Sequence, residues 1–436
     1  MKTRAISIAC AAALAAAGLP GAARAQTRVT SSDTSTWLGI SGQLRLRGEG
    51  WTGFGAGAPV TARHDDAFGL TRLKLRAEAH LRGALALVAE IKSSLVTDRS
   101  LAGGRRPSDE DVVDFQQFFA ELHGRAAGAS TTIRGGRFDL ALGRERLVSP
   151  LDWTNSQRAF QGIQATATGK GNQLQLFWVR PVIMRQSLAD LPDPARQLYG
   201  AQLARTWPNL RAEFYWLRNE TRTATYNGTT GYEQRHTIGT RLSRRPAAGS
   251  ADADVEVAFQ LGSVGGAPVR AWMVGSQAGW TLPGSLGARF YAGFDAASGD
   301  HAAGGSVQTF NQLYPLGHAY LGYADVHGRQ NVLDGSVGGS VKIATNLALL
   351  LDAHDFYRAS QNDALYAVDG SVSRPAGTGR ASHVGEELDL TLRRAAAQGR
   401  LILQAGVSRY FAGTFLRQSG PALDMNFIYG QVTASF

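Results

Sequence analysis

Residues 72 to 81 read Arg72-Leu73-Lys74-Leu75-Arg76-Ala77-Glu78-Ala79-His80-Leu81. In this stretch, charged or imidazole side chains alternate strictly with apolar ones. A period of two is the signature of a β-strand with two different faces. Such a strand fits a soluble sandwich, whose charged face meets water. It also fits an outer-membrane barrel, whose charged face lines a lumen and whose apolar face meets lipid.

The N-terminus predicts export. Lys2 and Arg4 precede an apolar, Ala-rich run over residues 6–19, and Ala23-Arg24-Ala25 supplies small residues for cleavage. This is the pattern of a secretory signal peptide, and the run is too short to span a membrane. We therefore expect residues 1–25 to be removed, and residues 26–436 to form a single domain.

The cysteine content and the net charge exclude some functions and favour others. The only cysteine, Cys10, lies inside the signal peptide, so the mature chain has no disulfide, thiolate catalyst or cysteine metal site. Removal of Lys2, Arg4 and Arg24 leaves 42 basic and 35 acidic residues, a net charge of +7. This excess suggests an anionic partner. Nucleic acid is disfavoured, because the chain is exported and its basic residues alternate along strands instead of forming one run.

Amphipathic runs recur along the whole chain, and no later segment approaches the ~18 apolar residues of a transmembrane helix. Alternating runs lie at 38–49, 85–92, 117–123, 173–178, 255–261, 289–295, 347–354, 387–392 and 401–407. Longer polar stretches fall at 52–67, 98–111, 143–158, 183–196, 219–234, 299–316, 360–384 and 412–424. At roughly 22 residues per strand and its connections, the chain predicts 16–18 strands, about 18, in an all-β antiparallel up-and-down transmembrane barrel.

The C-terminus favours the barrel over the sandwich. Ile428, Val432, Ala434 and the terminal Phe436 share one strand face. A last strand that ends in Phe resembles the C-terminal signature of outer-membrane barrels, which their assembly machinery reads. Together with the signal peptide and the recurring two-faced strands, this ending predicts the bacterial outer membrane as the location.

Three segments carry a family resemblance. They are Gly136-Arg137-Phe138-Asp139-Leu140-Ala141-Leu142-Gly143, Phe310-Asn311-Gln312-Leu313-Tyr314-Pro315-Leu316-Gly317-His318 with its continuation to Asp325, and Leu351-Asp352-Ala353-His354-Asp355-Phe356-Tyr357. With the barrel pattern, the chain resembles the alginate-export family over residues 37–436. The resemblance implies an 18-stranded barrel with an electropositive lumen that passes an anionic polysaccharide outward.

Five cations on two early strands are the strongest candidates for that lumen. An Arg or Lys facing lipid costs roughly 2–4 kcal/mol at the bilayer midplane, so these side chains must face inward. They are Arg45, Arg47, Arg72, Lys74 and Arg76, and their expected charge partners are Glu49, Glu78, Glu90 and Asp139. Cations left over can hold successive carboxylates of a polymer, and weak multiple contacts suit transport.

A second basic group surrounds a predicted strand end. Arg137, Arg144, Arg146 and Arg158 fit either an anion-selecting constriction or ordinary loop charge that contacts lipopolysaccharide phosphates. Arg137 is the preferred lumen residue among them. Trp153 lies in the same region and is the tryptophan expected to contact the lumen, whereas most others sit at strand ends, as an interfacial girdle does.

His318, Asp325 and His354 leave two interpretations open. A hydrolase would use a histidine–aspartate pair to activate water, but no nucleophilic serine stands in a recognisable motif. The favoured interpretation is a hydrogen-bonded loop or plug. No spacing ties these residues into a metal site, so neither metal nor cofactor is expected.

The sequence therefore predicts a non-enzymatic outer-membrane channel for an anionic polysaccharide such as alginate. An anion-selective uptake porin for small acidic solutes is the alternative, and a hydrolase is the third possibility. Expected partners are the anion, outer-membrane lipid with lipopolysaccharide, and periplasmic secretion proteins. The barrel is expected to be a monomer.

Overall fold

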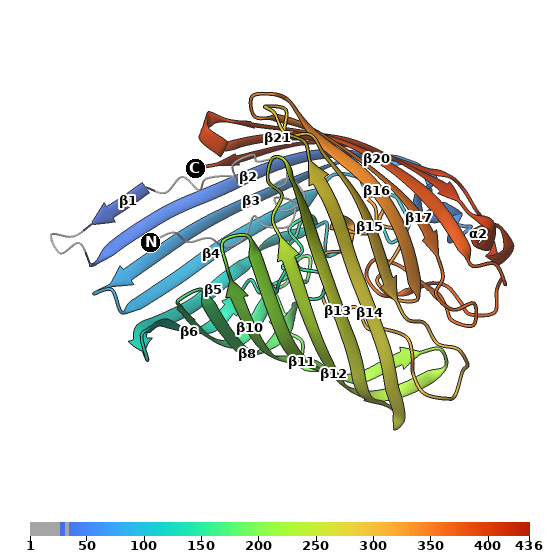
Figure 1. Ribbon diagram of the computed structural model, residues 1–436, viewed down its shortest axis with the longest axis horizontal. Helices are drawn as coiled ribbons and strands as arrows, with labels where there is room; N and C mark the ends of the chain where they lie inside the picture. Colours follow the sequence, from blue (N-terminus) through green and yellow to red (C-terminus); the bar gives the residue numbers. More distant parts are fainter. Residues whose placement is uncertain (1–26, 31–34) are drawn as a thin grey trace.

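The computed structural model describes residues 27–30 and 35–436 and forms a closed antiparallel barrel of 18 strands (Figure 1). The predicted signal peptide lies outside the described residues. The barrel strands are β2 (Trp37–Thr52), β3 (Asp66–Leu81), β4 (Leu85–Val96), β5 (Asp111–Ala126), β6 (Ala129–Phe138), β7 (Phe160–Gly169), β8 (Asn172–Ile183), β10 (Arg196–Thr206), β11 (Leu210–Tyr226), β12 (Thr229–Arg244), β13 (Ser250–Val264), β14 (Ala267–Thr281), β15 (Arg289–Ala297), β16 (Val332–Ala344), β17 (Leu347–Tyr357), β20 (His383–Ala396), β21 (Leu401–Ala412) and β22 (Met425–Ser435). The predicted fold class and strand number are confirmed.

Closure joins the two ends of the chain. The last strand, β22, pairs with β2 from Gln43↔Ser435 to Thr52↔Asn426. Beyond that ladder, Gly42 and Phe436 exchange two backbone hydrogen bonds of 2.7 and 3.0 Å. The short strand β1 (Thr27–Thr30) pairs with the start of β2. The first and last strands therefore leave no open seam over this ladder, as a membrane-spanning sheet requires.

The connections differ between the two rims of the barrel. One rim, here called the short-turn rim, has tight links such as 170–171 and 345–346, and the opposite, long-connection rim holds most of the longer segments. The predicted long connection at 219–234 is wrong: β11 and β12 run through it and leave only 227–228 between them. These polar residues continue the ladder beyond the apolar part of both strands, so polarity alone was a misleading guide to a loop.

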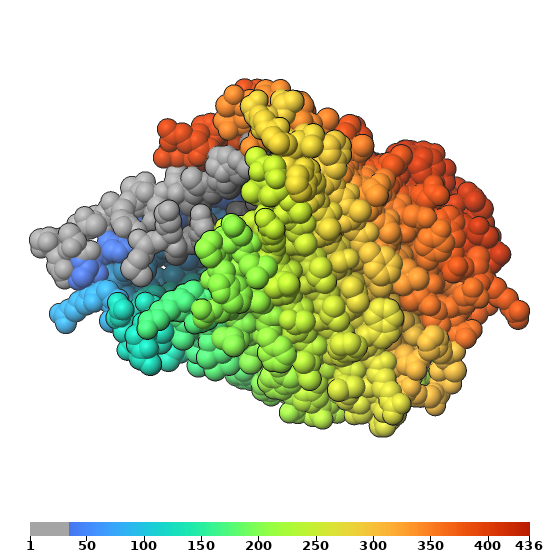
Figure 2. All heavy atoms as spheres, viewed as in Figure 1, coloured from blue at the N-terminus to red at the C-terminus, as the bar shows by residue number. Residues whose placement is uncertain are grey.

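The outer surface is apolar along the strands. Exposed hydrophobic side chains include Leu38, Ile40, Leu46, Leu75, Leu87, Ile91, Phe259, Leu261, Leu388 and Leu390. In Figure 2 the colours follow one another around the visible surface, as expected for consecutive neighbouring strands. Among the described residues, helices are confined to α2 (Thr414–Ser419) and three short 3-10 turns, η1 (Phe54–Gly57), η2 (Gly317–Ala319) and η3 (Ala397–Gly399). None of the described helices is long and apolar enough to cross a bilayer.

The hydrophobic core lies on the inner side of the wall. Two segments fold inward and supply much of it: residues 139–159, the first inward connection, and residues 298–331, the second. Val148 of the first and Tyr314 of the second pair as a parallel bridge. Short strands β9 (Leu191–Pro192), β18 (Leu365–Tyr366) and β19 (Val372–Arg374) belong to other long-rim connections.

Candidate functional site

Strands β2 and β3 hold a column of inward-facing cations. Arg45, Arg47, Arg72, Lys74 and Arg76 occupy alternate positions, and together they are called the basic ladder. The pleat requires this orientation, because their neighbours Leu46 and Leu75 are exposed on the outer face while Arg72 is only 2 % exposed. All five side chains of the basic ladder therefore lie on the inner side of the barrel wall.

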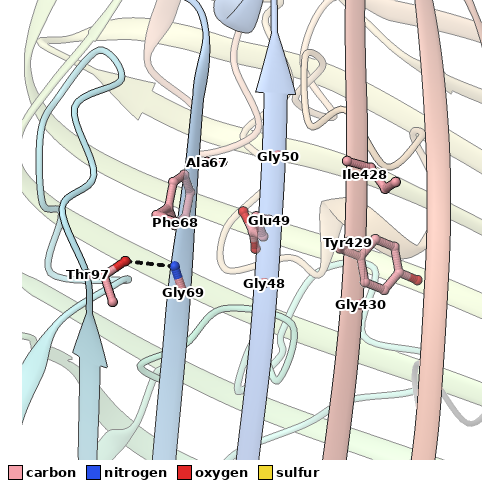
Figure 3. A pocket seen from close by; sticks show the side chains of 10 residues that line it. All are labelled: Gly48, Glu49, Gly50, Ala67, Phe68, Gly69, Thr97, Ile428, Tyr429 and Gly430. Carbon is pink, nitrogen blue, oxygen red and sulfur yellow. Dashed lines mark hydrogen bonds between the residues drawn. The ribbon is translucent and has the colours of Figure 1, made fainter.

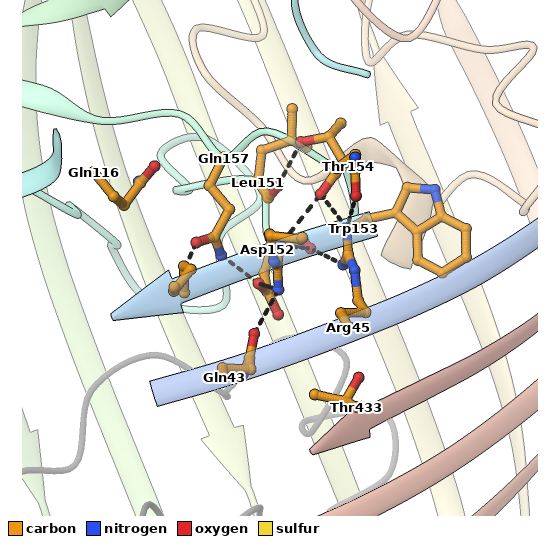
Figure 4. A network of polar contacts seen from close by, with 12 residues as sticks. Gln43, Arg45, Gln116, Leu151, Asp152, Trp153, Thr154, Gln157 and Thr433 are labelled. Atoms are coloured by element: carbon orange, nitrogen blue, oxygen red, sulfur yellow. Dashed lines mark hydrogen bonds and ion pairs between the residues drawn. The ribbon is translucent and has the colours of Figure 1, made fainter. Parts of the chain in front are cut away.

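Arginines of the basic ladder donate hydrogen bonds to the backbone of the first inward connection, as Figure 4 shows for Arg45. Arg45 donates hydrogen bonds to the carbonyl oxygens of Asp152 (2.9 Å) and Thr154 (2.6 Å). Arg47 donates to the carbonyl oxygen of Trp153 at 2.7 Å. Arg72 donates to the Asp152 carbonyl at 3.1 Å. Three consecutive carbonyls thus stand where oxygen atoms of an anion could bind.

Carboxylates neutralise the ladder unevenly. Close ion pairs join Arg47 to Glu49 (2.9 Å), Arg72 to Asp152 (2.8 Å), Lys74 to Glu90 (3.2 Å) and Arg76 to Glu78. Within the described residues, Arg45 forms no ion pair, and its hydrogen bonds end on carbonyl and amide oxygens. Asp139 accepts hydrogen bonds from Gln116 (2.6 Å) and Gln117 (3.2 Å). Arg45 is therefore the cation of the basic ladder whose hydrogen bonds all go to neutral oxygen atoms.

The first inward connection reaches across to β13. Arg146 Nη1 lies 2.7 Å from Asp254 Oδ1 and 3.3 Å from Glu256 Oε2, and Arg144 lies 3.7 Å from Asp254. Arg158 donates to the carbonyl oxygen of Ser149 at 3.1 Å. The segment accordingly presents carbonyls to the basic ladder and arginines to carboxylates of β13. Arg144, Arg146 and Arg158 hold the connection in place in this conformation.

The second inward connection packs on the first through aromatic rings. His318 stacks on Trp153 with ring centroids 3.7 Å apart, and Arg47 lies 4.4 Å from the centre of the same indole. His318 Nδ1 lies 3.2 Å from Asp325 Oδ1. His318 and Asp325 both lie in the second inward connection. Trp153 is already stacked, so it does not offer a free sugar platform here.

Carboxylates of β20, which is three strands away from β2 around the barrel, hold the same connection. The backbone N–H of Ala324 donates to Glu387 at 2.7 Å, and that of Tyr323 donates to Asp389 at 3.3 Å. The two inward connections therefore use complementary backbone groups: carbonyls toward cations and N–H groups toward carboxylates. The hydrogen bonds from the ladder arginines are strengthened by the charge of the guanidinium groups.

Two predicted site residues lie elsewhere than expected. His354 is part of strand β17, not of a loop, and its Nδ1 lies 3.0 Å from Asp334 Oδ2. Arg137 on β6 is the cross-strand partner of the outward-facing Phe118 on β5. Its guanidinium contacts Asp114 (3.0 Å) near the long-connection rim. Along β6, Ile133 is exposed and Phe138 is fully buried, so the regular alternation of this strand places Arg137 on its outer face. Arg137 therefore does not join the basic ladder.

Two carboxyl groups of the first inward connection have pKa values that are shifted in opposite directions. Although burial favours the neutral form, Arg72, Arg45 and Lys74 lower the pKa of Asp152 to about 2. Burial raises the pKa of Glu145 to about 7, against a hydrogen bond from Ser149 Oγ. Asp152 thus stays charged beside the ladder, whereas Glu145 changes charge near neutral pH.

Sequence reasoning missed the residues that fasten the connection. Asn155 Nδ2 donates to the carbonyl oxygens of Thr71 (3.1 Å), Leu95 (3.0 Å) and Asp109 (2.9 Å). Lys92 Nζ lies 3.0 Å from Ser156 Oγ. Lys92 and the β13 carboxylates could have been found from strand alternation, but nothing local in the sequence marks Asn155 as an anchor.

A shallow depression on β22, β2 and β3 is not a convincing site (Figure 3). Gly430, Gly48 and Gly69 are neighbours across these strands and leave a gap in the side-chain layer. The depression brings few polar groups together, in contrast to the first inward connection. The latter remains the candidate functional site.

The geometry gives no support to hydrolysis. In the described part of the chain, no serine hydroxyl hydrogen-bonds to the ring of His318 or His354. Among the described residues, Asp355, His383 and Glu386 form a group that could hold a metal ion, and the alternation of β17 and β20 places it on the outer side of the barrel. The guanidinium groups of the basic ladder are of the kind that bind anionic oxygens.

Comparison with known proteins agrees with the architecture. Solved structures from Pseudomonas aeruginosa share the fold: OpdO (TM-score 0.61, 13% identity, covering 92% of this chain and 97% of that one), OccK8 (OprE) (0.60, 11%, 92% and 98%) and the outer membrane protein OpdK (0.60, 10%, 91% and 98%). No curated protein matches this sequence. The chain thus shares the fold of these porin-like β-barrels.

The family model described as alginate export matches residues 36–429. The chain belongs to the alginate-export family, as its three motif segments predicted. It is accordingly a transport protein of the outer membrane.

Proposed function

We propose that this protein is a passive channel that passes an anionic polysaccharide, such as alginate or a related uronate polymer, from the periplasm outward. The observation that carries the proposal is the contact of Arg45, Arg47 and Arg72 with three consecutive loop carbonyls. Such oxygens are exchangeable for the carboxylates of a polymer, since guanidinium groups bind both. Membership of the alginate-export family supports the same substrate class.

In this mechanism, the first inward connection and the polymer compete for the basic ladder. A uronate carboxylate that reaches Arg45 replaces the carbonyls of Asp152 and Thr154, and the next uronates engage Arg72 and Lys74 in turn. Each contact is shared among several donors, so no single site holds the polymer tightly. Conduction requires binding that is strong enough for entry and weak enough for release.

Reversal potentials in a planar bilayer under a salt gradient test the proposal. The wild type should prefer anions, and polyuronate should reduce its small-ion current. The triple variant Arg45→Gln, Arg72→Gln, Lys74→Gln should lose most of that preference. The matched control changes three exposed cations, Arg63, Arg380 and Arg417, to Gln and should retain it. A wild-type preference for cations would contradict the proposal.

Uptake of small acidic solutes is the second candidate. The first inward connection is tied to β13 by Arg146 and to β2 by Arg45, which suits a fixed constriction that needs no displacement. Liposome swelling separates the candidates: a small-solute porin admits monomeric uronate quickly and is indifferent to long polymer. A polymer channel instead releases polyuronate trapped in the liposomes.

Export and assembly complete the proposal. Cleavage after Ala25 would give a mature chain that starts at Gln26, which N-terminal sequencing of the outer-membrane form tests. The barrel acts as a monomer among lipopolysaccharide, with periplasmic secretion proteins delivering the polymer. Crosslinking of the protein in intact cells tests both statements.

A further inference from the structure

A cluster of polar side chains lies outside the lumen, at the end of β17 and the start of β20, where the connection 358–382 joins these strands. Asp355 on β17 and Glu386 on β20 are direct cross-strand partners. A register shift after Phe356 brings Tyr357 opposite His383. Because Phe356 is fully buried inside the barrel, its neighbour Asp355 points outward. These polar groups therefore gather on the outer side, at the long-connection rim.

The ligand-capable atoms of this cluster converge. One oxygen each from Asp355 and Glu386 and one ring nitrogen from His383 all lie within 4.8 Å of one another. His383 Nε2 is 3.2 Å from Asp355 Oδ1. That Oδ1 atom is shielded from solvent and accepts no hydrogen bond from the described residues. The hydroxyl of Tyr357 donates to the other oxygen, Oδ2, at 2.9 Å, and so orients the carboxylate.

Charge balance favours a bound cation. Like charges directly opposite each other on one sheet face destabilise a strand pair. No Lys or Arg among the described residues forms an ion pair with Asp355 or Glu386, and the His383 imidazole supplies at most one positive charge. The cluster thus keeps a net negative charge unless a further cation binds. A divalent ion would remove the repulsion and hold both strands.

The donor set indicates the kind of ion. Imidazole nitrogen combined with carboxylate oxygen suits first-row divalent metals such as Zn²⁺, whereas Ca²⁺ and Mg²⁺ prefer oxygen alone. Three protein ligands leave a fourth position for water in a tetrahedral site. A hydrogen bond that orients a ligating carboxylate, as Tyr357 provides, is a common outer-sphere support.

We propose that Asp355, His383 and Glu386 bind a divalent transition-metal ion of the Zn²⁺ type at the outer rim, with Tyr357 positioning Asp355. The ion joins the end of β17 to the start of β20. It thereby links the two ends of the connection 358–382, which follows Tyr357 and precedes His383. Because the ion binds the folded barrel, the free energy of unfolding rises as the metal concentration increases above the dissociation constant.

Calorimetric titration of tag-free barrel in detergent micelles with ZnCl₂ tests this site. The wild type should bind one equivalent that His383→Ala and the isosteric Asp355→Asn and Glu386→Gln each weaken at least tenfold. Tyr357→Phe should weaken it by about tenfold, the lower end of the usual cost of losing an outer-sphere partner. His301→Ala, an exposed histidine on another connection, is the matched control and should bind as the wild type does.

A second measurement does not depend on heats of binding. Co²⁺ should give a d–d absorption spectrum of low coordination number with the wild type and lose it with His383→Ala. Unfolding on heated gels should shift to higher temperature with Zn²⁺ only when the cluster is intact. Equal Zn²⁺ binding by the wild type and His383→Ala, or no binding by the wild type, would overturn the proposal. Variants with native heat-dependent gel mobility are folded, so their loss of binding is informative.

Discussion

Asn155 shows how one side chain fixes a long segment. Its Nδ2 group donates to carbonyls of Thr71, Leu95 and Asp109, which come from three separate parts of the chain. Asn155→Ala removes these hydrogen bonds from a buried place, a loss of about 1–3 kcal/mol in docking free energy. We expect the first inward connection to leave the lumen more often and trypsin to cleave faster at Arg144 and Arg146.

The control for this variant is Asn209→Ala, which changes an exposed asparagine in the short turn between β10 and β11. It should leave both the cleavage rate and the bilayer current at wild-type values. Wild-type cleavage of Asn155→Ala, with an unchanged current, would show that the connection stays docked without the hydrogen bonds of Asn155.

Glu145 gives the same segment a pH dependence. Burial raises the pKa of its carboxyl to about 7 from the ordinary value of 4.5. A group that binds its proton more tightly when docked stabilises docking fully below about pH 4.5 and loses this contribution as the pH rises through 7. We therefore expect channel opening to increase with pH in that range, measured as open probability in bilayers.

Glu145→Gln mimics the protonated side chain and should flatten this response, with few openings at any pH. The exposed carboxylate Asp369, changed to Asn, is the control and should keep the wild-type profile. A Glu145→Gln channel that still opens as the pH rises would assign the response to another group.

At the scale of elements, the two inward connections act as one unit. Val148 and Tyr314 pair as a parallel bridge, with Tyr314 N donating to the Leu147 carbonyl at 2.8 Å. Bridge partners of this kind have Cα atoms within the range that a disulfide spans. The described chain has no cysteine, so Val148→Cys with Tyr314→Cys can lock the two connections together. Oxidation should stop polyuronate passage, and a reductant should restore it.

Each single cysteine variant, treated in the same way, controls for the loss of Val148 or Tyr314. Polymer flux measured from preloaded liposomes is the readout. Undiminished flux through the oxidised double variant would mean that the two connections need not separate during transport.

Strands were predictable from sequence because their signal is local. The alternation at 72–81 places each cation on one face of β3 without reference to any other part of the chain. The contacts inside the barrel join residues that are far apart in the sequence. Arg45 and Asp152, for example, are 107 residues apart. Arg137 was assigned to the lumen from its motif segment and not from the alternation of β6, which places its side chain on the outer face. The inner surface therefore depends on long-range partners that periodicity does not report.

At the scale of the whole molecule, the contact between Gly42 and Phe436 lies at one end of the β2–β22 seam that closes the barrel. A Cβ atom on Gly42 would lie 2.4 Å from the ring of Phe436, whereas one on Gly48, on the same outward face of β2, would meet nothing within 4 Å. An aromatic ring that covers a strand glycine in this way helps to fix register. Gly42→Val should therefore displace Phe436, weaken the β2–β22 seam and lower the fraction of folded barrel on unheated gels. Gly48→Val places the same β-branched side chain in open space and should assemble normally. Adding Phe436→Ala to Gly42→Val relieves the clash but leaves the seam without its ring, so assembly should recover only in part. Full assembly of Gly42→Val alone would show that the backbone ladder closes the barrel without this contact.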